Sequence, residues 1–153
     1  MPMTAREYFD GVRDAVRRRR EAELFVEFDG DDWRPPRAPG VGVGDPTANA
    51  AVYRADVLAE RLDEARREIE SCEEVIGGAL ELIAGIGAAL GGRGAPYADV
   101  LELYYIDLMT WGDVANELGC SDRYCRMLRN VALDWVDAVG LPRARGGEGI
   151  AWL

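Results

Sequence analysis

The segment from Thr110 to Leu133 has the spacing of a helix-turn-helix. Thr110 is a good helix N-cap, and Asp113 occupies the capping-box position three residues later. Gly119 follows the last apolar residue of this helix, where glycine adopts a left-handed C-cap at the lowest cost. Ser121 is a second N-cap. The segment therefore predicts two helices joined by a tight turn.

The apolar residues of this segment fall in helical phase. Val114, Ala115 and Leu118 share one face of the first predicted helix, and the small Ala115 lets a second helix cross closely. The expected buried face of the second helix consists of Cys125, Leu128, Ala132 and Leu133. Two helices crossing in this way form the DNA-binding helix-turn-helix, whose second helix enters the major groove.

The exposed side of the second predicted helix is polar and basic near its start. The candidate DNA-binding residues are Ser121, Arg123, Tyr124, Arg126, Met127, Arg129 and Asn130. Arginine bonds guanine bidentately and asparagine bonds adenine. The residues assigned to base edges are Arg123, Arg126, Met127 and Asn130. Arg129 and Tyr124 are assigned to phosphates, and Ser121 caps the helix. The structural alternative is an ordinary helical hairpin with a solvated face.

This C-terminal segment resembles the region-4 domain of bacterial sigma-70 factors, which recognises promoter DNA with its second helix. The matching residues are Tyr104-Tyr105-Ile106, Trp111, Val114-Ala115, Leu118-Gly119, Ser121, Cys125, Leu128 and Ala132-Leu133. The wider chain is similar to phage late-transcription regulators of the ArpU/RinA type, which begin with a helix like that at Ala5-Arg6-Glu7-Tyr8. The resemblance implies a transcription regulator that contacts double-stranded DNA and RNA polymerase.

The net charge of −10 is a departure from this pattern, because nucleic-acid-binding proteins usually carry a basic footprint. Residues 46–92 hold nine acidic residues and four arginines, so half of the net charge lies there. The second helix of the predicted motif keeps three arginines on one side. We expect one module to bind DNA weakly and a dimer to be needed.

A long amphipathic helix is predicted after the N-cap and N1 pair Asp45-Pro46. Its apolar stripe comprises Val52, Ala55, Ala59, Leu62, Ala65, Ile69, Cys72, Ile76, Ala79, Ile83, Ile86 and Leu90. A helix of this length needs a partner along its stripe. The partner is either the N-terminal helix, opened by a capping box at Thr4 and Glu7, or the same helix of a second subunit. We expect a homodimer. Gly85 and the glycines after it are expected to weaken the helix end into a hinge.

The chain is therefore predicted to be all-α, with five segments. These are an N-terminal helix (1–28), a Gly/Pro linker (29–45), a coiled-coil-like dimerisation helix (46–92), a sigma-70 region-4-like helix-turn-helix (93–140) and a tail (141–153). The apolar patch from Leu24 to Phe28 must pack on something. Pro142 is expected to end the helical region. Trp33 could anchor the linker, and Trp152 could dock the tail.

Several function classes are disfavoured by composition. The chain has no histidine and no lysine, and its two serines have structural explanations, so we expect neither an enzyme nor a cofactor. Three cysteines without a CxxC pair indicate a reducing compartment and no metal site. No apolar run is long enough to span a membrane, so a cytoplasmic protein is expected. The alternatives to a regulator are a phage packaging or structural adaptor and an acidic inhibitor that mimics DNA.

Overall fold

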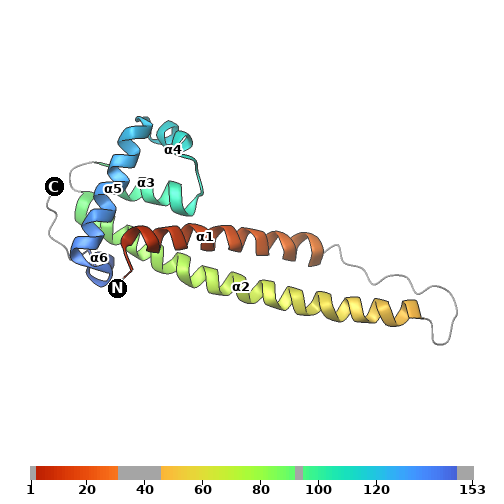
Figure 1. Ribbon diagram of the computed structural model, residues 1–153. Helices are drawn as coiled ribbons and strands as arrows, with labels where there is room; N and C mark the ends of the chain where they lie inside the picture. Colours follow the sequence, from red (N-terminus) through yellow and green to blue (C-terminus); the bar gives the residue numbers. More distant parts are fainter. Residues whose placement is uncertain (1–2, 31–45, 92–94, 148–153) are drawn as a thin grey trace. The chain divides into compact units, whose positions relative to one another are not determined.

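The computed structural model is helical, and it contains no β-strand in the residues it describes, which are 3–30, 46–91 and 95–147 (Figure 1). The all-α prediction is therefore confirmed. Trp33 and Trp152 lie outside the described residues, as do most of the predicted linker and the end of the tail.

The described chain forms six α-helices and two short π-helical segments. In order they are α1 (Ala5–Leu24), η1 (Phe25–Gly30), α2 (Pro46–Leu90), α3 (Tyr97–Leu101), η3 (Glu102–Ile106), α4 (Trp111–Leu118), α5 (Asp122–Val139) and α6 (Leu141–Arg145). The predicted long helix is confirmed as α2, which runs for 45 residues and includes Gly77 and Gly78. Both π-helical segments continue the α-helix before them.

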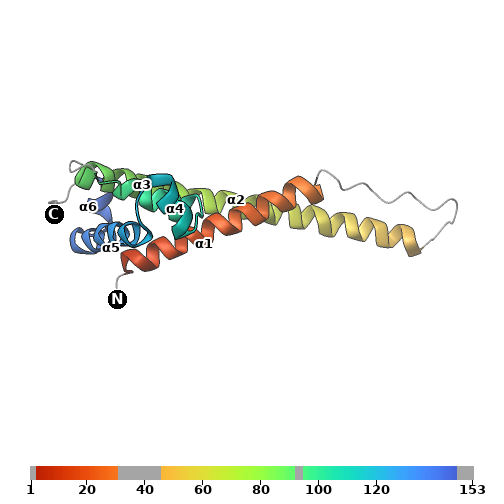
Figure 2. The ribbon, with the colours of Figure 1, turned by 90° about the horizontal axis from the view of Figure 1, so that it is seen from above.

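Two compact units divide the chain. The first unit contains Met1–Arg17 and Glu73–Leu153, and the second contains Arg18–Cys72. The first unit thus combines the start of α1, the end of α2 and all of α3 to α6, which lie together in two perpendicular views (Figures 1 and 2). The helix-turn-helix segment belongs wholly to this unit.

The core of the first unit collects side chains from distant parts of the chain. Phe9 of α1, Leu82 and Ile86 of α2, and Tyr105 and Trp135 are all fully buried. The predicted buried face of α5 is confirmed, because each of its four members is at most 1% exposed. Burial of these apolar groups supplies the main force that holds α5 in place.

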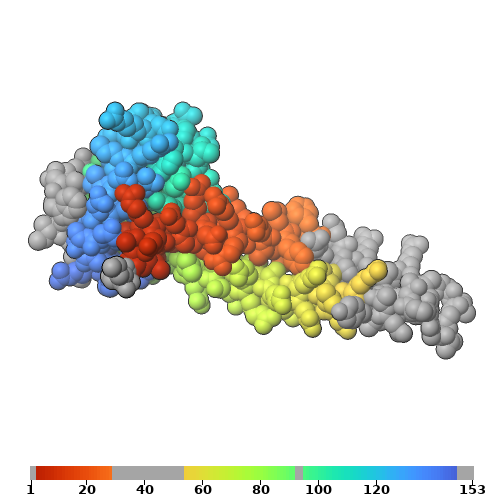
Figure 3. Space-filling view, viewed as in Figure 1, coloured from red at the N-terminus to blue at the C-terminus, as the bar shows by residue number. Residues whose placement is uncertain are grey.

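Hydrogen bonds within α1 and to α5 fix the start of α1. The predicted capping box is present, since Thr4 Oγ1 accepts from the Glu7 N–H and Glu7 Oε2 accepts from the Thr4 N–H. The Ala5 N–H donates to Asp137 Oδ1 at 2.7 Å, so the start of α1 lies against α5 (Figure 3).

The expectation that Pro142 ends the helical region was wrong. Proline in the first turn of a helix costs no hydrogen bond, and Pro142 lies in the first turn of α6 rather than ending the helical region.

In the second unit apolar side chains are only partly covered. Among its described side chains only Cys72 is buried. Leu62, Ala65 and Ile69 are half-buried. The predicted packing of the patch from Leu24 to Phe28 is only partial in the described chain, because Phe25 and Val26 are half-buried whereas Leu24 is 52% and Phe28 is 57% exposed. An apolar face therefore remains open to solvent in this unit.

Candidate nucleic-acid interface

Local hydrogen bonds build the turn between α4 and α5. Thr110 Oγ1 accepts from the Asp113 N–H at 3.2 Å, which caps the start of α4. Gly119 ends the helix with φ 67° and ψ 32°, the left-handed conformation that glycine adopts without strain. Ser121 Oγ then accepts from the Tyr124 N–H at 3.1 Å and caps α5. All three predicted caps are confirmed, and they fix where the second helix begins.

One side of α5 packs into the core while the opposite side of its first turns is open. Cys125 and Leu128 are buried, and so is Val114 on the facing helix α4. Arg123 and Arg126 are exposed, and Tyr124 and Met127 are 40% and 48% exposed. The start of α5 thus presents two arginines together with two bulky side chains.

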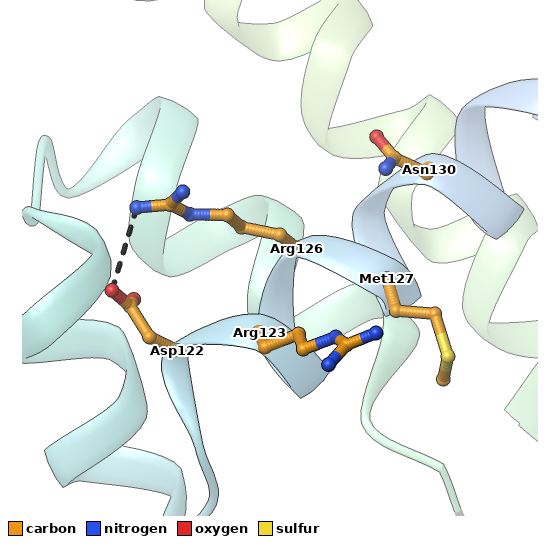
Figure 4. Close-up of a pocket in the computed structure, with 5 residues that line it drawn as sticks. All are labelled: Asp122, Arg123, Arg126, Met127 and Asn130. Atoms are coloured by element: carbon orange, nitrogen blue, oxygen red, sulfur yellow. Dashed lines mark hydrogen bonds and ion pairs between the residues drawn. The ribbon is translucent and has the colours of Figure 1, made fainter.

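The two exposed arginines have different surroundings, which are drawn in Figure 4. Arg126 Nη2 lies 3.4 Å from Asp122 Oδ2, one helical turn earlier. Both side chains are about half exposed, and such a surface ion pair is worth at most about 1 kcal/mol. Arg123 makes no hydrogen bond or ion pair with any residue that the structure describes. Neither arginine is therefore held firmly by the protein.

Arg129 lies instead at one end of a stack of four side chains. The Arg13 guanidinium lies 4.0 Å from the centre of the Tyr104 ring. Tyr104 stacks on Trp111 with ring centres 4.0 Å apart and an interplanar angle of 14°. Arg129 covers the other face of Trp111 at 4.9 Å. This cation–π stack joins α1, η3, α4 and α5.

Asn130 is also engaged within the protein. Its Oδ1 accepts from Arg129 Nε at 3.1 Å and from Arg6 Nη2 at 3.2 Å. Bidentate recognition of adenine needs both the oxygen and the nitrogen of an asparagine amide. Arg129 also faces the Tyr105 hydroxyl. Burial raises the pKa of Tyr105, and the charge and hydrogen bond of Arg129 partly oppose that rise.

The seven predicted site residues therefore fall into two groups. Ser121, Arg123, Tyr124, Arg126 and Met127 are exposed at the start of α5, and Arg123, Arg126 and Met127 line one shallow hollow together with Asp122 and Asn130. Arg129 and Asn130 are half-buried and bonded to other side chains. Sequence reasoning missed Arg13, whose buried Nε has no hydrogen-bond partner in the described chain. Tyr104 and Trp111 lie on separate elements, η3 and α4, so no helical spacing in the sequence indicates that they stack.

Comparison of the chain with protein-family models, with curated proteins and with solved structures found no match. The geometry of α4 and α5 is therefore the basis for a functional inference. None of the described helices is both long and apolar enough to cross a membrane.

Proposed function

We propose that this chain is a sequence-specific transcription regulator that inserts the start of α5 into the major groove of double-stranded DNA. One observation carries the proposal. Two capped helices meet across the left-handed Gly119, and the second one leaves Arg123 and Arg126 exposed on its outer face. A recognition helix in such a motif contacts base edges with its N-terminal residues.

Each exposed residue has a chemical role in this proposal. Arg123 and Arg126 donate to guanine, whose N7 and O6 accept a bidentate arginine. The weak ion pair between Arg126 and Asp122 gives way to that contact, because exposed pairs contribute little. Met127 supplies an apolar contact for a thymine methyl group. Tyr124 and the capped start of α5 at Ser121 face phosphates.

Arg129 and Asn130 take a different role from the one that the sequence suggested. Arg129 covers Trp111 and donates to Asn130, so its charge supports the fold of the motif. Its guanidinium still adds positive potential beside the DNA-facing surface. We therefore assign base recognition to Arg123 and Arg126, and we assign Arg129 and Asn130 to positioning α5.

The proposal includes a homodimer, because one module on a protein of net charge −10 attracts DNA poorly. The open apolar face of the second unit supports self-association. Two modules on repeated half-sites raise the overall affinity without new contacts in either module. The resemblance to phage late regulators favours a phage or prophage protein that acts in the cytoplasm and also contacts RNA polymerase.

DNA selection tests the DNA-binding proposal. The full-length protein is incubated with a random duplex library at low and at moderate salt, and bound duplexes are sequenced. We expect one enriched motif, which the double variant Arg123→Ala/Arg126→Ala loses. Arg143→Ala is the matched control, since Arg143 is an exposed arginine of α6 outside this surface. If no motif is enriched, or if the double variant enriches the same motif, an adaptor or a DNA-mimic function replaces regulation.

Light scattering tests the dimer separately. We expect the wild type to be dimeric at micromolar concentration and Leu24→Asp/Phe28→Asp to shift it toward a monomer. Leu80→Asp is the control, because Leu80 is also exposed, at 41%, but belongs to the first unit. A wild type that remains monomeric at high micromolar concentration contradicts the dimer. The DNA-binding proposal is then still decided by the DNA selection.

A further inference from the structure

Two cysteine sulfurs touch across the turn of the helix-turn-helix. Cys120 lies in the turn before α5, and Cys125 lies in the first turns of that helix. Their Sγ atoms are 3.1 Å apart, and neither is in a disulfide. Two carbon atoms in ordinary contact lie roughly 3.5–4.0 Å apart, and sulfur is the larger atom. The fold thus brings together two thiols that lie five residues apart and form no CxxC pair in the sequence.

The two thiols differ in their access to solvent. Cys120 is partly exposed, whereas Cys125 is fully buried. Burial raises the pKa of the Cys125 thiol to about 11, and the neighbouring Cys120 adds to the rise. A dissolved reagent therefore reaches Cys120 first, and Cys125 is placed to react only with a group already on Cys120.

We propose that Cys120 and Cys125 are an oxidation site, in which a small disulfide oxidant such as oxidised glutathione links the two thiols into an intramolecular disulfide. The Cys120 thiolate attacks the oxidant, forms a mixed disulfide and releases one glutathione thiolate. The Cys125 thiolate then attacks the Cys120 sulfur and releases the second glutathione thiolate. Two protein thiols lose two electrons and two protons, and oxidised glutathione takes them up as two thiols.

The bond requires little movement, since an S–S bond is about 2.05 Å long and the sulfurs start 3.1 Å apart. Once formed, it ties the turn that contains Ser121 to the buried side of α5. The reduced turn is held by the Gly119 and Ser121 caps and by the Cys120 N–H, which donates to the Ala115 carbonyl oxygen at 3.1 Å. The disulfide forms whether or not α5 binds DNA, so the outcome is independent of the function proposed above.

Thiol titration and intact mass after treatment with oxidised glutathione test this site on the full-length protein. We expect the wild type to lose two titratable thiols and two hydrogen atoms, with no added mass. Cys72→Ser should form the same disulfide. Cys125→Ser should stop at one glutathione adduct, because the second thiol is missing. A wild type that keeps all its thiols, stops at the adduct or becomes linked to a second chain overturns the proposal, and no variant is needed to see this.

The order of the two steps has its own measurement. Acid quenching during oxidation gives the rate at which the adduct on Cys120 converts to the disulfide. Below the raised pKa of Cys125, its thiolate fraction grows about tenfold per pH unit, so conversion should accelerate by about a hundredfold between pH 7 and pH 9. A conversion rate that does not change over this range contradicts the role of Cys125 as the second thiol.

Discussion

Along α5 the first two arginines, Arg123 and Arg126, differ from the third, Arg129, in what surrounds them. The first two are exposed, with at most one weak ion pair between them and the described protein. The third covers Trp111 and donates to Asn130. Residue type and spacing are the same for all three. The neighbouring helices therefore decide which arginines remain exposed for binding and which one stabilises the fold.

Helix geometry explains where the change occurs. Each residue turns an α-helix by about 100°, so a spacing of three falls short of a full turn by about 60°. Arg129 is therefore about 120° around α5 from Arg123, which brings it toward Trp111 of α4. Arginines spaced three residues apart therefore do not share one face, and the third of them lies where it contacts the protein.

Of the three effects compared, the largest is the loss of stability when Trp111 is removed from the cation–π stack. Trp111→Ala deletes the ring between Tyr104 and Arg129, and loss of a large aromatic from a packed site costs about 3–5 kcal/mol when it is fully buried. Because Trp111 is half-buried, we expect a loss of about 2–4 kcal/mol in the free energy of unfolding. Urea unfolding followed by circular dichroism measures it, with Trp111→Phe as the milder control. A change below about 0.5 kcal/mol, typical of a surface substitution, would show that the stack does not hold the motif.

The next largest effect is the difference in stability loss between Arg129→Ala and Arg123→Ala. Arg129→Ala removes a cation–π contact and a charged hydrogen bond, so it should cost about 1–2 kcal/mol of stability. Arg123→Ala should change stability by less than about 0.5 kcal/mol, because it removes no contact with the described protein. Equal losses in the free energy of unfolding, measured in urea, would contradict the different roles assigned to the two arginines.

The smallest effect is on the titration of Tyr105. Burial raises its pKa, whereas the positive charge of Arg129 favours the phenolate and lowers it. Loss of Arg129 should therefore move the Tyr105 pKa further upward, and Arg123→Ala should leave it unchanged. Carbon-13 NMR of labelled tyrosine follows the titration, and Tyr105→Phe assigns the signal. A downward shift in Arg129→Ala would place Arg129 away from the hydroxyl.

Sequence alone was sufficient where the deciding contacts are local. The caps at Thr110 and Ser121 each bond a backbone N–H three residues ahead, and Gly119 was identified by its position after the last apolar residue. The buried face of α5 followed from helical periodicity. Such features depend on a few neighbouring residues, so they leave a pattern in the sequence.

Contacts between distant segments left no such pattern. The stack joins Arg13 to Arg129 through two rings, and nothing near either arginine in sequence indicates the other. Gly85 suggested a hinge, but a Cβ there would collide with the backbone oxygen atoms of Ala144 and Arg145. Because Gly85 has no side chain, the α6 backbone can pack directly against α2 at this position. Packing of this kind can be recognised only after the fold is known.

A salt-dependent DNA titration tests the central claim most directly. The wild type, Arg123→Ala, Arg126→Ala and Arg129→Lys are titrated against the selected duplex and a scrambled duplex, and folding of each is confirmed beforehand by circular dichroism. Arg123→Ala and Arg126→Ala should each lose about 1–3 kcal/mol on the selected duplex and much less on the scrambled one. Arg129→Lys keeps the charge and should bind nearly as the wild type does. If the first two variants bind the selected duplex like the wild type, or if only Arg129→Lys loses sequence preference, the start of α5 is not the recognition surface.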